Sequence, residues 1–165
     1  MVASHDKILV VGAVEVLAYN DTDGTRKERA GRVRFALIPV AREESLGRFV
    51  ERNVDPGSRV RTEGWPGYSA RALADFMHHI RVIGRAQRAH KRLHHIHRAF
   101  GNLNTWLSGT HQGVEPKHRQ SYLDGYDFRY NRRKTPRSLS DIRKHENFGA
   151  RIWLRINDLD SATVI

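Results

Sequence analysis

The run KILVVGAVEV at Lys7–Val16 gives the clearest structural signal in the sequence. Its side chains are almost all apolar and many are β-branched, which is typical of a strand buried on both faces of a sheet. The run is much shorter than the roughly 20 apolar residues that span a membrane. It also contains Glu15 and lacks a small-residue cleavage site. We therefore predict a buried strand here, and neither a signal peptide nor a membrane segment.

The segments that follow alternate between strand and helix signals. Arg32–Val40 (RVRFALIPV) alternates polar and apolar residues like a strand with one solvated face, and Pro39 suits its end. Between the two strands, Leu17–Ala30 is polar and is expected to be a connection that contains a turn. Ser45–Val54 places its apolar residues on one helical face, so we expect a helix there.

Short elements are then expected before a helical second half. The patterns predict a strand at Ser58–Thr62, a helix at Ala70–Phe76 and a strand at His79–Ile83. Apolar residues at one-turn spacing predict a helix around Ile96–Leu107, and Pro116 can open a second one. Strands first, then mixed elements, then helices indicate an α/β layered domain.

Basic residues dominate the charge of the chain. Lys and Arg number 29 against 18 Asp and Glu, which gives a formal net charge of +11. The surplus is concentrated in His78–Arg98 and Lys117–Lys144, and the first of these stretches contains no acid. Such charge favours polyanionic partners, that is DNA, RNA or an anionic membrane surface. Because there is no glycine-rich phosphate loop and no cysteine, a nucleotide-driven enzyme and a cysteine-based zinc site are disfavoured.

Four segments, in the same order along the chain, resemble insertion-sequence DNA transposases of the DDE superfamily. They are VVGAVEV (Val10–Val16), GRVRFALIP (Gly31–Pro39), VDPGSRVRTEGWPGY (Val54–Tyr68) and HIHRAFGNLNTWLSGTHQGVEPKHRQSYLDGYDFRYNRR (His95–Arg133), and the stretch NLNTWLSGTHQGV is specific. The similarity is to the subgroup whose catalytic signature is Asp-Asp-Asn-Lys. It implies a ribonuclease-H-like fold, an α/β mixed sheet flanked by helices. It also implies magnesium-dependent cleavage of DNA ends and their joining to a target.

The resemblance implies where the catalytic residues lie. The second Asp of the signature corresponds to Glu63, the Asn to Asn102 and the Lys to Asn104. The first Asp belongs to a strand before VVGAVEV, which this sequence lacks, and Asp6 is a poor substitute for it. The three matching positions are the candidate catalytic residues, and Glu63 and Asn102 are the expected metal ligands. Arg98, four residues before Asn102, shares its helix face and is a candidate phosphate contact.

The departures from the signature predict weak magnesium binding and inefficient catalysis. Phosphoryl transfer in such sites needs two metal ions, roughly 3.5–4 Å apart, held mainly by oxygen ligands. Glu63 keeps a charge but is one methylene longer than Asp, and a misplacement of about 1 Å can cost about 100-fold in rate. Asn104 cannot make the charged phosphate contact of a Lys. Asn102 and Asn104 also point about 160° apart on an ideal helix, so both cannot ligate one metal.

DNA is the expected partner, both as transposon ends and as target. Beside Arg98, the candidate DNA-binding residues are Lys117, Arg132 and Arg133. A homo-oligomer or an assembly with an intact transposase is also expected, and the predicted location is the cytoplasm, at the nucleoid, without membrane association. The alternatives are a non-catalytic nucleic-acid-binding protein or regulator of an intact transposase, and a metal-dependent hydrolase with another substrate.

Histidines and aromatic residues near these positions have alternative roles. His94, His95 and His97 are a weak candidate zinc site, because no acid or Cys accompanies them in the run. Trp65 and Tyr68 are candidates to stack on bases, but we expect them to pack beneath their loop instead.

The resemblance divides the chain into two parts. Residues 1–133 are expected to form a catalytic domain truncated at its N-terminus, so that its first strand is missing and a sheet edge is exposed. Residues 134–165 are expected to be a divergent tail with no match to the family. Within that tail, Arg151–Ile156 could pair as a strand or pack as a helix.

Overall fold

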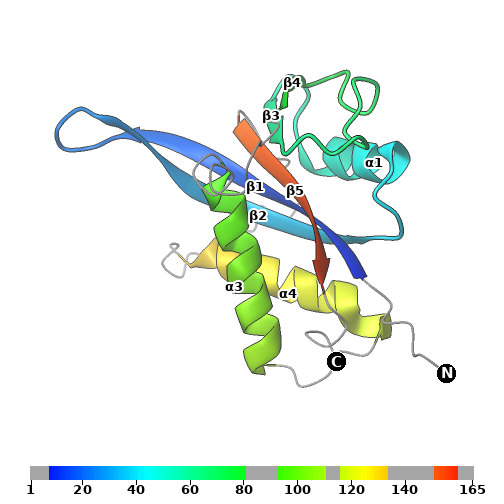
Figure 1. The fold of residues 1–165 in the computed structure, drawn as a ribbon. Coiled ribbons are helices and arrows are strands. Elements are labelled where there is room, and N and C mark those ends of the chain that lie inside the picture. Colours follow the sequence, from blue (N-terminus) through cyan, green and yellow to red (C-terminus); the bar gives the residue numbers. More distant parts are fainter. Residues whose placement is uncertain (1–7, 81–92, 111–115, 134–150, 160–165) are drawn as a thin grey trace.

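A mixed five-stranded sheet forms the centre of the fold. The structure is a computed structural model that describes residues 8–80, 93–110, 116–133 and 151–159. The strands are β1 (Ile8–Asn20), β2 (Arg26–Ile38), β3 (Arg59–Thr62), β4 (Met77–Ile80) and β5 (Arg151–Leu159), and the helices are α1 (Glu43–Asn53), α3 (His94–Thr110), the 3-10 helix η1 (Pro116–His118) and α4 (Arg119–Arg132). The strand order is β2-β1-β5-β3-β4. Figure 1 shows α3 and α4 on one face of the sheet and α1 on the other, so the expected α/β class is confirmed.

The first two strands form one long antiparallel hairpin. β1 is buried or half-buried from Ile8 to Val16, which confirms the strand predicted there. β1 continues to Asn20 and β2 begins at Arg26, so the long polar connection expected at Leu17–Ala30 is wrong. Pairing between the polar ends of the strands extends the hairpin as an arm, and the turn is confined to its tip (Figure 1). Gly24 at that tip has a φ of 75°, a left-handed conformation that glycine adopts without strain.

The two faces of β1 belong to two hydrophobic cores. Val10 and Val14 pack in the core beneath α3 and α4. Val11 and Ala13 pack in the core beneath α1. Because successive side chains of a strand point to opposite faces, a nearly continuous apolar run is what a strand between two helical layers requires.

The central strand comes from the far end of the described chain. β5 pairs antiparallel with β1 and parallel with β3, and it lies between them. Arg151–Ile156, which the sequence leaves open between strand and helix, is therefore a strand. Ile152 and Leu154 are fully buried in the core beneath α1. In the described residues the sheet is continuous from β2 to β4.

The outer edge of β2 is covered by side chains of α4. Asn131 bonds both backbone groups of Val33, since its Oδ1 accepts from the N–H at 2.7 Å and its Nδ2 donates to the carbonyl at 2.9 Å. Asp127 accepts a hydrogen bond from the N–H of Phe35 at 3.0 Å, and Gln120 accepts one from the N–H of Leu37 at 2.9 Å. These side chains replace a partner strand and prevent the edge from pairing with another chain.

Two short elements differ from the sequence-based expectation. The helix predicted at Ala70–Phe76 is a series of turns, with isolated bonds such as Phe76 N–H to Leu73 C=O at 3.0 Å. So short a segment forms too few hydrogen bonds to offset the cost of helix nucleation. The strand predicted at His79–Ile83 is observed at Met77–Ile80, and residues 81–83 lie outside the described part of the chain.

Candidate active site

Glu63, the expected second acid of the signature, directly follows β3 and forms an ion pair. Its Oε2 lies 3.7 Å from Nε of Arg155 on β5. The Glu63 side chain is 27% exposed and that of Arg155 is 24% exposed. The register explains the contact, because Arg61 of β3 is level with Trp153 of β5 in a parallel pair. Two residues further along, Glu63 follows the end of β3 and Arg155 lies on β5, so the two side chains are level with each other.

Arg155 also connects the sheet to α3. Its Nη1 donates a hydrogen bond to Nδ1 of His97, near the start of that helix. A guanidinium carries several N–H donors in a rigid fork, so one arginine can hold both the end of β3 and the start of α3. His97 must be neutral to accept this bond, because a protonated imidazole has no acceptor nitrogen.

Two uncharged groups lie near Glu63, the hydroxyl of Tyr68 and the contact between Thr62 and His78. Tyr68 is 3% exposed, and burial, together with the charge of Glu63, raises the pKa of its hydroxyl well above its usual range. Thr62 is fully buried, and its Oγ1 lies 2.9 Å from Nε2 of His78. Burial lowers the pKa of His78, which favours the neutral imidazole. In this environment Arg155 is a cation that balances the carboxylate of Glu63.

The two candidate asparagines lie further along α3. Asn102 is exposed and Asn104 is half-buried, in keeping with their different directions on the helix. They follow His97 by five and seven positions, which is roughly 7 and 10 Å along the axis at 1.5 Å per residue. Oδ1 of Asn104 is buried and has no hydrogen-bond partner in the described residues. The helix therefore reaches the Glu63–Arg155 pair through His97, and not through a hydrogen bond from either asparagine.

The donor set at Glu63 does not fit a magnesium centre. Magnesium takes six oxygen ligands in near-octahedral geometry, usually with one or two carboxylates among them. The carboxylate of Glu63 instead faces a guanidinium. Among residues 8–80, 93–110, 116–133 and 151–159, no group of three or more His, Cys, Asp or Glu side chains is placed to hold a metal ion.

The alternative zinc site at the start of α3 is not supported in the described part of the chain. The rings of His94 and His95 lie 3.9 Å apart, but His97 is directed to Arg155. Burial, followed by the nearby charge of His94, lowers the pKa of His95 to about 4. His95 is buried and favours its neutral form, which is typical of a packed core histidine, and among the described residues no group of three or more His, Cys, Asp or Glu side chains is placed to hold a metal ion.

The two aromatic residues of the loop after Glu63 differ in exposure. Tyr68 is buried beneath the loop, as expected. Trp65 is 49% exposed, although its Nε1 donates to the carbonyl of Ala41 at 2.8 Å. The expectation that both pack beneath the loop therefore holds for Tyr68 alone.

The candidate DNA-binding residues fall into two groups. Arg98, Lys117 and Arg132 are exposed on α3, η1 and α4. Arg133 is also exposed, but its guanidinium donates to the Ala30 carbonyl at 3.0 Å and to a carbonyl of the last turn of α4 at 2.8 Å. These bonds fix the end of α4 to β2, so both Nη groups of Arg133 are already used within the fold.

Sequence patterns did not identify Arg155 as a site residue. It lies in RIWLRI at residues 151–156, where the local signal is a charge within an apolar run. Its partner His97 was singled out only as a possible zinc ligand. The contact depends on strand pairing between segments nearly a hundred positions apart, which no local pattern reports.

Comparison with known protein families identifies the family to which the chain is similar. A family model described as ISXO2-like transposase domain matches residues 2–131, which is most of the sequence and includes β1 to α4 except for its last residue. No curated protein and no solved structure matches the chain. In the described residues, no helix is both long enough and apolar enough to cross a membrane. The match over most of its length shows that the chain belongs to the ISXO2-like DDE transposase domain family.

Proposed function

We propose that this chain is a transposase-family domain that binds DNA but does not catalyse efficient metal-dependent DNA cleavage. The observation that carries the proposal is the ion pair between Glu63 and Arg155. The carboxylate that would have to bind a metal ion is already neutralised by a side chain of the neighbouring strand. Weak magnesium binding then follows from charge, in addition to the substitution at Glu63.

The strand order supports a ribonuclease-H-like sheet in which one strand, β5, comes from a later part of the sequence than in the family. Two acids that share metal ions must lie within a few ångströms of each other, so the first Asp of the signature should stand on a strand next to β3. β5 is such a neighbour, parallel to β3 and antiparallel to β1. Arg155 is level with Glu63 on that strand, so we propose that Arg155 occupies the place of the first acid.

An arginine at this place opposes metal binding directly. Two unit charges 4 Å apart interact by about 4 kcal/mol at an effective dielectric constant of 20. A divalent ion beside Glu63 carries two charges and would be repelled by Arg155 by up to about twice that energy at the same distance, while the attraction of the carboxylate is shared with the guanidinium. Breaking the existing pair would also leave a partly buried charge without its partner.

DNA binding is supported by family membership and by charge. The matched family is one of transposases, and the formal net charge is +11. Each lysine or arginine that neutralises a phosphate releases counterions, so the affinity should fall steeply as salt rises. The proposed activity thus needs neither Glu63 nor a metal ion.

The test uses the purified full chain with supercoiled plasmid and a labelled duplex. We expect a mobility shift that weakens between 50 and 200 mM salt, and no nicking in Mg²⁺ or Mn²⁺ above a metal-free control. Metal-dependent nicking that is abolished by Glu63→Gln would overturn the proposal, because that variant separates intrinsic activity from a contaminating nuclease. Absence of a shift at low salt would overturn the DNA-binding part.

A further inference from the structure

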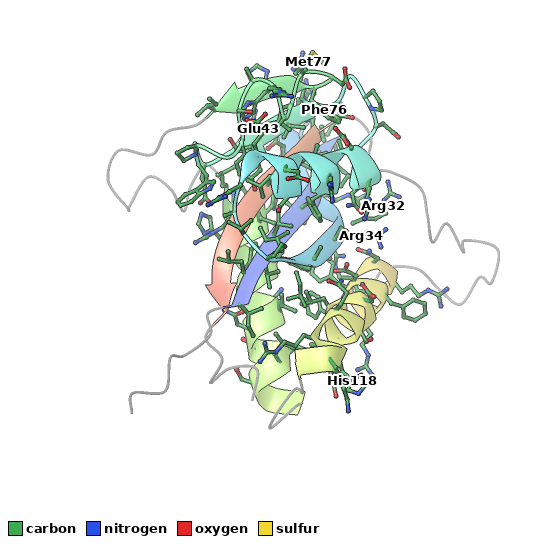
Figure 2. The ribbon with its side chains drawn as sticks, turned by 90° about the vertical axis from the view of Figure 1, so that its right-hand side faces the viewer. Arg32, Arg34, Glu43, Phe76, Met77 and His118 are labelled. Atoms are coloured by element: carbon green, nitrogen blue, oxygen red, sulfur yellow. The ribbon has the colours of Figure 1, made fainter. Side chains whose placement is uncertain are left out.

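Helix α4 presents three different faces. At 100° per residue, Leu123 and Tyr126 point into the core beneath the sheet, and both are buried. Asp127 and Asn131 point to the edge of β2 and bond its backbone. The remaining arc, about 100° wide, is called here the outer stripe, and Figure 2 shows one of its members, His118, at the start of the helix. The outer stripe consists of His118, Ser121, Gly125, Phe128, Arg129 and Arg132.

The two inner faces hold the outer stripe in a fixed orientation. Contacts of α4 with β2 run along the whole helix, from Gln120 in its first turn to Asn131 in its last. Arg133 adds bonds to the β2 backbone beyond the C-terminal end. A ligand surface on such a helix loses little conformational entropy when a partner binds.

The cations of the outer stripe are held over aromatic rings. The Arg132 guanidinium lies 4.1 Å from the ring centroid of Phe128, and that of Arg129 lies 5.9 Å from the ring of Trp106. Neither arginine forms an ion pair with an acid of the described residues, unlike Arg32 or Arg151. Stacking uses the flat face of a guanidinium and leaves its N–H edge available to acceptors.

The shape and charge of the stripe suit close approach of a polyanion. It contains no acid, and the nearest one on the helix, Asp124, accepts a hydrogen bond from Gln120 at 2.9 Å. A Cβ at Gly125 would meet nothing within 4 Å, so the helix surface there is open. Phe128 is 45% exposed, which leaves a large apolar edge beside two cations.

We propose that the outer stripe of α4 is a docking surface for the phosphate backbone of duplex DNA, with Arg129 and Arg132 as the phosphate contacts. Guanidinium groups bind phosphate oxygens through paired, charge-assisted hydrogen bonds. Arg129 and Arg132 are three residues apart and therefore neighbours on the helix, so they can contact one strand together. The inference rests on the proposed DNA binding and assigns it to a surface on the helix that covers the β2 edge.

The test compares two variants with the same loss of charge. R129A/R132A removes the two proposed contacts, and R52A/R71A removes two exposed arginines from α1 and the loop beyond β3. Binding of the full chain to a fluorescent duplex is measured by anisotropy from 50 to 200 mM salt. For R129A/R132A we expect the slope of log K against log salt to become less steep by about 1.8, at about 0.9 per phosphate contact. For the control pair we expect little change.

A second variant covers the case in which the double substitution disturbs folding. Ser121→Glu places an acid on the same stripe from an exposed position and is expected to weaken binding while leaving the circular dichroism spectrum unchanged. Equal weakening by R129A/R132A and R52A/R71A, or no effect of Ser121→Glu in the folded protein, would overturn the inference. Failure of the unmodified chain to bind any duplex at 50 mM salt would instead overturn the proposed function.

Discussion

Replacing Asp127 with Asn should make the stability of the domain less dependent on pH. The Asp127 side chain is 2% exposed, between α4 and the edge of β2. Its Oδ2 accepts from Phe35 N–H at 3.0 Å, but its Oδ1 is buried without a hydrogen-bond partner in the described residues. Burial raises the pKa of Asp127 from 3.8 to about 8, although the Phe35 bond and the charge of Arg34 act in the opposite direction.

The raised pKa fixes the sign of the effect. Below about pH 4 the carboxyl is protonated in the folded and the unfolded state, so it does not lower the free energy of unfolding. Between about pH 4 and 8 the unfolded state releases the proton and the folded state retains it, so stability falls as pH rises. At 1.36 kcal/mol per pH unit, the loss at pH 7 is (7 − 3.8) × 1.36, or about 4 kcal/mol.

Asn removes this titration while it keeps an acceptor for Phe35. Its NH₂ group then faces the unpartnered side of the site, at a cost of about 1–3 kcal/mol. We therefore expect Asp127→Asn to be less stable than the unmodified chain at pH 4.5 and more stable at pH 7. The swing between the two pH values is (7 − 4.5) × 1.36, or about 3 kcal/mol, which is roughly 6–12 °C in Tm for a domain of this size.

The assay is thermal and urea unfolding at pH 4.5, 7 and 8.5, followed by far-ultraviolet circular dichroism. Asp124→Asn is the matched control, because it removes the same charge from an exposed carboxylate one turn earlier on α4. We expect the change in stability between pH 4.5 and 7 to be larger for Asp127→Asn than for Asp124→Asn, because only Asp127 of the two is buried. If the change from Asp127→Asn were the same at pH 4.5 and 7, the reasoning from burial would be refuted.

Three further substitutions test other parts of the structure. Asn131→Ala removes two bonds to the edge of β2, at 2.7 and 2.9 Å, and should cost about 2 kcal/mol in urea unfolding; no loss would contradict the role of α4 as an edge cover. Gly12→Ala places a Cβ 2.6 Å from the Phe35 ring and should cost about 1–3 kcal/mol, while an unchanged urea midpoint would show that the ring can move aside. Arg155→Asp places a second carboxylate beside Glu63 and should create Mn²⁺ binding measurable by calorimetry; a folded variant that binds no better than Arg155→Asn would contradict the assigned place of Arg155.

The parts of the fold that sequence predicted are those with a local physical signature. β1 was predicted because a β-branched run between two cores needs apolar side chains on both faces. α3 and α4 were predicted because apolar residues recur at one-turn spacing and Pro116 marks where the second helical segment begins. The turn at Gly24 followed from its residue types, but the length of the hairpin arm did not, since polar strands carry no burial pattern.

Other parts depend on contacts that form only in three dimensions. Asp127 and Asn131 are ordinary polar helix residues in the sequence, and their function as a cover for β2 depends on how α4 is placed against that strand. At Ala70–Phe76 the sequence pattern predicts a helix, but the segment forms only turns. It is too short for its hydrogen bonds to offset the free-energy cost of helix nucleation. Local preference is a weak guide where tertiary packing decides.

The charge that faces Glu63 could not be predicted, because it is set by a strand from elsewhere in the chain. Pairing of β5 with β3 closes a loop of about ninety residues, and no local pattern links the two segments. Compared with the Asp of the signature, Glu63 has one extra methylene, which displaces its carboxylate by about 1 Å. An arginine in place of a carboxylate changes the neighbouring charge by two units, and at a few ångströms that difference is the larger effect. We therefore expect that Glu63→Asp alone would not create metal binding, whereas removal of the Arg155 cation is a precondition for it.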